Sequence, residues 1–321
     1  MELRKDYILD RWVILATARA KRPHQFKLEK KTEPPKTDFF APGNEHLTPT
    51  EIMRVVDENN HDNWKIRVFP NKFAAVEPEG NSEIKTDNTF FTFSDAYGHH
   101  EVVVETPDDR QLWDLSEDEI HSVLKVYSER IKALSSDPNI KYACVFKNSG
   151  KEAGTSIVHS HSQIISYNKV PETVQQEINA VANFETCPYC DIINIEKDSS
   201  RRCFENDNFV AFTPYCSRFP FEIWVFPKQH LTNITEMNND QIDQMAEIMK
   251  NILVKLKELN APFNYVLHYS PQGENLHFHV EILPRLSTWA GFEMNGTIIN
   301  TMTPETAAEF YRGETPPEEE K

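Results

Sequence analysis

The sequence contains the same order of short motifs twice, and this repeat constrains the fold more than any other feature of the 321 residues. In each half, a strand-like segment that ends at a proline precedes a helix with a polar start and then two further strands. The expected strands that close the halves are 142–148 and 156–166, then 265–270 and 276–283. The last strand of each half carries His-x-His, at His159/His161 and at His277/His279.

The two helices have clear sequence signals. Ser116 and Glu119 form a capping-box pattern that opens a helix to about Leu134, and a second helix is expected from about Asn238 to Leu259. Apolar residues recur at helical spacing in both. They are Ile120, Val123, Leu124, Tyr127 and Ile131 in the first, and Ile242, Met245, Ile248, Met249, Ile252 and Leu256 in the second.

Four motifs that recur in one order favour duplication over a chance likeness between two α+β domains. We therefore predict an α+β fold made by tandem duplication of an antiparallel sheet with packed helices. The expected boundaries are a first half at 1–169, a linker helix at 170–183, a second half at 184–312 and an acidic tail at 313–321.

Charge and glycine content exclude several classes of function. The net charge of −16 disfavours bulk binding of nucleic acid or an anionic membrane, although residues 1–36 carry a local +5. The 9 glycines form neither the dinucleotide fingerprint nor the P-loop pattern, so side chains would have to hold any phosphate. The N-terminus lacks an apolar signal core and no apolar run has the length of a membrane span, which makes a cytoplasmic location the expectation.

A polar segment of the first half carries the strongest candidate chemistry. If 156–166 is extended, His159, His161 and Gln163 lie on one face, behind a loop that contains Gly150 and Gly154. Imidazole can act as nucleophile or base near neutral pH. The alternative, a surface strand with incidental histidines, is less favoured because three polar groups are aligned.

This segment resembles the active-site strand of the galactose-1-phosphate uridylyltransferase branch of the histidine triad superfamily, which carries His-Pro-His-x-Gln. Further likenesses are Arg19-Ala-Lys-Arg22-Pro, Phe69-Pro-Asn71-x-Phe-Ala-Ala and Ala290-Gly-Phe-Glu293, so that the resemblance spans nearly the whole chain. The chain is also similar to the ADP-glucose phosphorylase group and archaeal relatives of that branch. The resemblance implies that each half is histidine-triad-like.

The resemblance implies transfer of a nucleoside monophosphate, UMP in the branch named, from a nucleotide sugar to a sugar 1-phosphate. His161 would attack the α-phosphorus and form a nucleotidyl-histidine, and Gln163 would donate hydrogen bonds to phosphoryl oxygens. Ser156 would complete the catalytic set. The other positions would contact substrate: Arg19, Arg22, Asn71, Asn148, Gly154, His159, Phe292 and Glu293. A homodimer is expected, as in the family.

Three other functions stay open at this point. A phosphorylase would use inorganic phosphate as acceptor, and a hydrolase would use water, although Gln163 in place of a third histidine favours transfer. A zinc-stabilised nucleotide-binding protein without catalysis is the third. Ser160 stands where the family has proline, which removes a backbone constraint beside His161.

Cys187-Pro-Tyr-Cys190 followed by two histidines is a Cys₂His₂ zinc pattern, and the repeat selects His230 and His277 as the partners. We expect one structural zinc ion in the second half. The rival is a glutaredoxin-like redox motif, disfavoured because the cysteines follow a helix at mid-chain.

The corresponding first-half site is predicted to be lost. Family members carry Cys-x-x-Cys where this chain has Asp38 and Ala41, and Asp109 replaces a strand-ending histidine. Only His159 of the four ligands remains. We expect packing, for example by Phe39 and Phe40, to stabilise this region instead, and the second-half pair His279 and Glu281 to be vestigial or structural.

Overall fold

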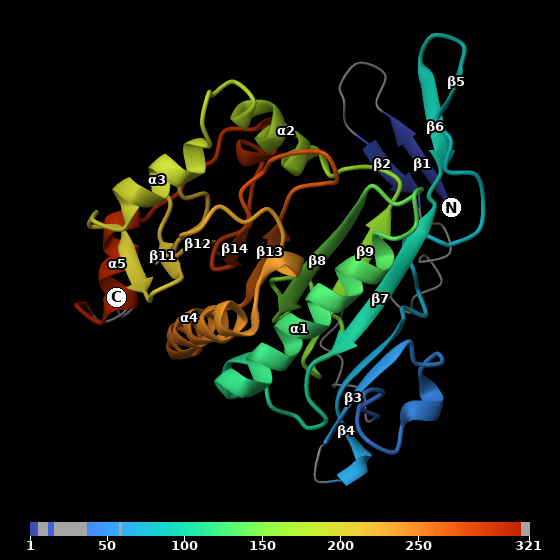
Figure 1. Ribbon diagram of the computed structural model, residues 1–321, viewed down its shortest axis with the longest axis horizontal. Helices are drawn as coiled ribbons and strands as arrows, with labels where there is room; N and C mark the ends of the chain where they lie inside the picture. The colour runs from blue at the N-terminus through green and yellow to red at the C-terminus, as the bar shows by residue number, and fades with distance from the viewer. Residues whose placement is uncertain (6–11, 16–36, 58–59, 316–321) are drawn as a thin grey trace. The chain divides into compact units, whose positions relative to one another are not determined.

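The computed structural model describes residues 1–5, 12–15, 37–57 and 60–315 (Figure 1). The chain divides into two compact units that are interleaved along the sequence. The first unit comprises 1–109, 130–145 and 159–176, and the second comprises 110–129, 146–158 and 177–321. These units are defined by compactness and do not test the limits of the duplicated halves. The expected boundaries at 169/170 and 183/184 therefore stay a prediction.

The first unit contains two antiparallel arrangements of strands. One has the order β2-β1-β6-β5, and the other has the order β9-β7-β4-β3. The bounds are β1 Glu2–Lys5, β2 Trp12–Leu15, β3 Met53–Asp57, β4 Asn60–Pro70, β5 Lys85–Asp87, β6 Phe91–Asp95, β7 Gly98–Val104 and β9 His161–Tyr167, with the 3-10 helix η2 at Glu45–Leu47. Trp64, Val68 and Val103 are among its fully buried side chains.

The second unit has strands in the order β10-β11-β12-β14-β13, and β13 pairs with Phe146–Ser149 of β8. All of these pairs are antiparallel. The strands are β8 Tyr142–Ser149, β10 Arg202–Glu205, β11 Phe209–Phe212, β12 Ile223–Pro227, β13 Phe263–His268 and β14 His279–Pro284.

Five α-helices complete the described chain, and α4 and α5 pack on β10 within the second unit. They are α1 Glu117–Leu134, α2 Glu172–Val181, α3 Pro188–Glu196, α4 Asn239–Glu258 and α5 Pro304–Arg312; the remaining 3-10 helices are η3 Leu112–Asp114, η4 Ile234–Glu236 and η5 Glu293–Asn295. None of the helices in the described ranges is both long and apolar enough to cross a membrane.

The predicted fold class and repeated order are confirmed. β7, α1, β8 and β9 follow one another in the first half, and β12, α4, β13 and β14 do so in the second (Figure 1). The capping box is present, since Ser116 N donates to Glu119 Oε2 at 2.8 Å and Glu119 N donates to Ser116 Oγ at 3.2 Å. All the apolar positions predicted to face inward from the two helices are buried.

Candidate functional site

The strand that carries the histidines is shorter than predicted, because β9 begins at His161 rather than at Ser156. Its partner β7 ends at Val104, which pairs with His161, and one further backbone bond joins Glu105 N to Ser160 O at 3.2 Å. Pro107 lies just beyond and has no N–H to continue the ladder. His159 and Ser156 are therefore in the loop before the strand, and the expected start of the strand at Ser156 was wrong.

His159 is buried, and both of its ring nitrogens have partners in the first unit. Nδ1 lies 2.7 Å from Oδ2 of Asp38, and Nε2 lies 2.7 Å from the backbone oxygen of Thr106. The edge of the Phe40 ring packs against this imidazole and against His161. Asp38, which stands where the family pattern has a cysteine, thus lies beside His159.

Phe40 is buried, as the packing hypothesis requires, whereas Phe39 is exposed. Phe40 is 6% exposed and contacts Phe69 as well as the two histidine rings. Phe39 is 42% exposed. The hydrogen bond between Asp38 and His159 is a contribution that sequence reasoning did not anticipate.

His161 is held in one ring orientation. Its Nδ1 lies 2.8 Å from the backbone oxygen of His159, and a carbonyl only accepts, so Nδ1 carries the proton. In the neutral imidazole the lone pair is then on Nε2. A buried imidazole with a fixed tautomer suits a nucleophile, because the attacking atom is defined before substrate binds.

Gln163 lies two residues further along β9 and receives hydrogen bonds from two side chains. The backbone N–H of Ala75 donates to Nδ1 of His100 at 3.1 Å, so Nε2 of His100 carries the proton and donates to Gln163 Oε1 at 2.9 Å. Asn71 Nδ2 reaches the same oxygen at 3.3 Å. The two donors fix the amide, and Gln163 presents its NH₂ group as a donor.

His100 is a site residue that sequence reasoning missed. It lies on β7 opposite Ile165, so it is a diagonal neighbour of Gln163 on the paired strand. The available signal was a histidine in the strand-like segment that ends at Pro107.

Ser160 is buried and donates from Oγ to Oε2 of the buried Glu105 at 2.7 Å. The backbone bond between the same two residues makes the link double. A side-chain bond therefore restrains the position at which the family has proline.

The other predicted residues belong to the second unit or fall outside the described residues. Asn148 is on β8 in the second unit, where its Oδ1 accepts from Asn264 Nδ2 at 2.8 Å. Gly154 and Ser156 are in the exposed loop that follows, and Gly154 has a φ of +88°, which favours glycine. Phe292 is 57% exposed, and Glu293 begins η5 and accepts from Ala290 N. Arg19 and Arg22 lie outside the described residues.

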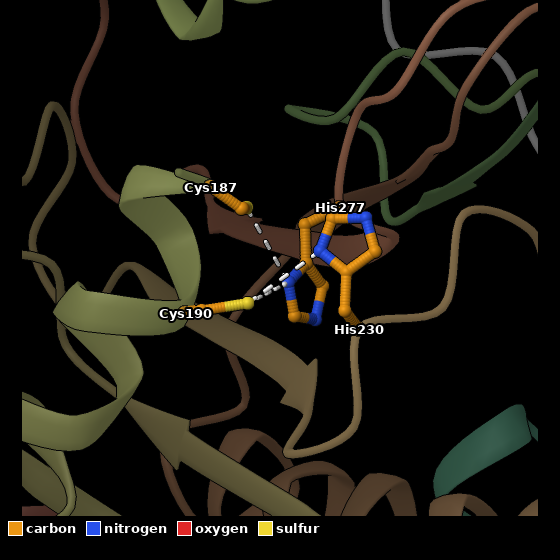
Figure 2. Close-up of side chains that lie close together, drawn as sticks. All are labelled: Cys187, Cys190, His230 and His277. Atoms are coloured by element: carbon orange, nitrogen blue, oxygen red, sulfur yellow. Dashed lines mark hydrogen bonds between the residues drawn. The ribbon is translucent and has the colours of Figure 1, made fainter. Parts of the chain in front are cut away.

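The four predicted metal ligands lie together in the second unit, as Figure 2 shows. Cys187 is the N-cap of α3 and Cys190 is in its first turn, where Pro188 suits the first helical position. His230 follows β12, and His277 precedes β14. Their ligand atoms all lie within 4.8 Å of one another.

The geometry fits a tetrahedral ion. Cys190 Sγ is 3.5 Å from Nδ1 of both His230 and His277, and Cys187 Sγ is 3.9 Å from Nδ1 of His277. Zinc–sulfur and zinc–nitrogen bonds at tetrahedral angles separate S and N by about 3.6 Å. Outside the cluster, Nε2 of His277 donates to Pro227 O and that of His230 to Asn275 Oδ1, both at 2.9 Å, which directs each Nδ1 inward. Burial lowers the pKa of His277 to about 4, so its imidazole stays neutral as a ligand must.

A second polar cluster in the second unit contains the buried His268, His279 and Glu281 and the partly buried Glu177. His268 Nδ1 lies 2.9 Å from Glu177, and Arg218 donates to Glu281 at 2.6 Å and to Glu222 at 2.8 Å. These cations compensate the buried carboxylates. The contacts of Arg218 and His268 with this cluster are consistent with a structural role for His279 and Glu281.

Comparison with known proteins connects both halves to one family. Residues 1–171 match the galactose-1-phosphate uridyl transferase N-terminal domain, and residues 98–311 match a domain of unknown function, DUF4921. ADP-glucose phosphorylase of Arabidopsis thaliana is 35% identical over 97% of this chain and 92% of its own length. Galactose-1-phosphate uridylyltransferase of Thermotoga maritima is 29% identical over 97% and 98%.

Solved structures agree. A uridylyltransferase has a TM-score of 0.81 at 27% identity, with 98% of both chains covered. The Arabidopsis thaliana ADP-glucose phosphorylase with bound ADP-glucose has a TM-score of 0.75 at 31% identity, with 97% of this chain and 99% of its own covered.

A buried histidine of fixed tautomer beside an oriented amide, in a fold shared end to end with these enzymes, places the protein among the nucleotidyltransferases. The chain belongs to the galactose-1-phosphate uridylyltransferase family and is a transferase.

Proposed function

We propose that the protein transfers a nucleoside monophosphate, UMP in the first instance, from a nucleotide sugar to a sugar 1-phosphate through a covalent adduct on His161. Two hydrogen bonds carry this proposal. His161 Nδ1 donates to the backbone oxygen of His159, and His100 Nε2 donates to Gln163 Oε1. They define which ring nitrogen of His161 has the lone pair and which group of the Gln163 amide is the donor, two residues apart on β9.

In the first step, Nε2 of His161 attacks the α-phosphorus, an N–P bond forms, and the P–O bond to the departing sugar 1-phosphate breaks. The Gln163 amide donates to a phosphoryl oxygen as charge develops there. In the second step, an oxygen of the acceptor sugar 1-phosphate attacks the same phosphorus, and the N–P electron pair returns to His161. Two displacements in sequence produce ping-pong kinetics.

The remaining predicted residues belong to the same proposal. Arg19 and Arg22 would pair with phosphates, and Asn71, Asn148, Ser156 and Gly154 would surround the nucleotide and phosphates. His159 would contact substrate beside His161, while Phe292 and Glu293 would contact the sugar. A homodimer, as the resemblance implies, is also part of the proposal.

We further propose that Cys187, Cys190, His230 and His277 hold one structural zinc ion. A closed set of four protein ligands supplies fold stability and leaves no position for substrate. Hydrogen bonds from His230 and His277 to fixed acceptors support the assignment.

Phosphorolysis is the second candidate, because identity to an ADP-glucose phosphorylase is 35%, compared with 29% for the Thermotoga maritima uridylyltransferase. The first half-reaction is the same in both cases. Only the acceptor differs, since inorganic phosphate would release a nucleoside diphosphate instead of a new nucleotide sugar.

The test begins with UDP-glucose and ADP-glucose, each labelled at the α-phosphate, without acceptor. We expect an acid-labile, base-stable phosphoramidate on His161 from one of them, and no label in His161→Ala. Adding galactose 1-phosphate or inorganic phosphate to the isolated adduct then identifies the acceptor by its product. Full turnover by His161→Ala would exclude the covalent mechanism, and absence of label with both donors would favour a binding protein.

A further inference from the structure

We propose that Asp38 is a positioning residue that holds His159 as an imidazolium and thereby fixes the carbonyl on which His161 depends. The inference deepens the function proposed above and rests on it. All the residues involved belong to the first unit.

Hydrogen-bond accounting at His159 requires two ring protons. Nε2 faces the backbone oxygen of Thr106, which can only accept, and Nδ1 faces a carboxylate oxygen of Asp38. Beside an ionised Asp38, a neutral imidazole with its one N–H would leave one of these 2.7 Å contacts without a donor. An imidazolium with an ionised Asp38 satisfies both.

Asp38 is suited to stay ionised. Burial by itself raises the pKa of its carboxyl, but hydrogen bonds from His159 and from the backbone N–H groups of Phe40 and Ala41 outweigh burial and lower the pKa below its ordinary value. The His159 side chain is 1% exposed and that of Asp38 is 43% exposed. The carboxylate therefore supplies, from the surface, the counter-charge that a buried cation needs.

The contacts that hold the His159 ring affect His161 through one backbone carbonyl, that of His159. His159 precedes β9 and is outside its ladder, so strand pairing does not fix its position. Instead, the ring is tied at both nitrogens, and the backbone oxygen of His159 accepts from Nδ1 of His161 at 2.8 Å. Displacing the ring would move this acceptor and with it the direction of the His161 lone pair.

The neighbouring charged groups are consistent with a single positive ring. His161 adjoins His159 through the backbone bond, and Glu105 is joined to Ser160. Phe40 covers the rings of His159 and His161 with its edge. Asp38 contacts the His159 ring directly, with Oδ2 at 2.7 Å from Nδ1.

Asp38→Asn is the informative variant, because it keeps the shape of the side chain and removes the charge. We expect the ¹⁵N signals of the His159 ring at neutral pH to change from the imidazolium pattern, with two similar nitrogens, to that of a neutral tautomer. We expect the rate of nucleotidyl-His161 formation to fall about 10-fold, with little change in the KM for donor, as for other residues that orient a functional histidine. Asp38→Glu should retain the imidazolium pattern and most of the rate.

Asp87→Asn, on the exposed β5 of the same unit, is the matched control and should change neither measurement. A neutral His159 ring in the unaltered protein would overturn the inference, as would an Asp38→Asn variant that forms the adduct at the unaltered rate. Absence of adduct in the unaltered protein would instead overturn the proposed function, while the ¹⁵N measurement, made without substrate, still tests the Asp38–His159 pair. If Asp38→Asn does not fold, the ¹⁵N signals of His159 in the unaltered protein and in Asp38→Glu still test the inference, because both should show an imidazolium.

Discussion

His100 and Asn71 both direct donor groups at Oε1 of Gln163, so the amide of Gln163 has a single orientation. The tautomer of His100 is set in turn by the backbone N–H of Ala75. An amide that is fixed before substrate binds needs no reorganisation as charge develops on a phosphoryl oxygen. At the scale of single residues, the site thus depends on groups that do not themselves react.

His100→Leu is expected to lower kcat about 10-fold and to change KM less, because Gln163 would lose one of its two orienting donors. His99→Gln is the matched control, since His99 is the adjacent residue of β7 and points to the opposite face of the strand. Steady-state kinetics of both variants, with whichever of UDP-glucose and ADP-glucose labels His161, provides the measurement. Equal loss in the two variants would show that the effect is not specific to Gln163.

At the scale of elements, side chains that cap and join the helices fix where each begins and what it contacts. Asn238 caps α4, because its Oδ1 accepts from Gln241 N at 2.9 Å. Gln241 Oε1 in turn accepts from Asn238 N. Glu177 of α2 reaches His268 at the end of β13. The first contact is local in sequence, whereas the second joins residues 91 positions apart.

The contact between α2 and β13 should make stability depend on pH. Burial alone would lower the pKa of His268, but the hydrogen bond to Glu177 and the charges of Glu281 and Glu177 raise it above 6.5. The stabilisation is therefore complete below pH 6.5 and is lost as the pH rises through the higher pKa of the folded state.

Urea unfolding of the unaltered protein and of His268→Gln between pH 5 and 9 tests this expectation. The difference in free energy of unfolding should be largest at the acid end and shrink towards pH 9. A difference that is independent of pH would mean that His268 contributes by packing alone. His121→Gln provides a partly exposed histidine for comparison.

At the scale of the whole molecule, the second unit brings four metal-ligand side chains together from three separate segments of the chain. In the first unit, Asp38 contacts His159. These two positions correspond to metal ligands in the family pattern. The two halves thus share an order of elements and differ in what stabilises the region beside the histidines.

Metal analysis of the purified protein should find about one zinc per chain. Prolonged chelation, or Cys190→Ser, should lower Tm by about 5 °C or more, because metal binding and folding are coupled. Cys216→Ser is the control, since Cys216 is an exposed free cysteine. A content of about two zincs per chain would contradict the predicted loss of the first-half site, and none would contradict the second-half assignment.

The order of elements, both long helices and the metal-ligand set could be predicted because each rests on a local or repeated pattern. Ser116 and Glu119 are three residues apart, and the repeat itself selected His230 and His277 for Cys187 and Cys190. The start of β9 could not be predicted, because it depends on where the partner β7 ends at Val104.

Sequence alone therefore determined the repeated α+β order, the family resemblance, the candidate nucleophile His161 and the four candidate metal ligands, since periodicity and spacing are properties of the chain. Tertiary structure decided which groups orient them. His100 meets Gln163 across two strands, and Asp38 meets His159 over 121 positions of sequence. Hydrogen bonds between distant segments depend on folded geometry within a few tenths of an ångström, and no pattern along the chain encodes that directly.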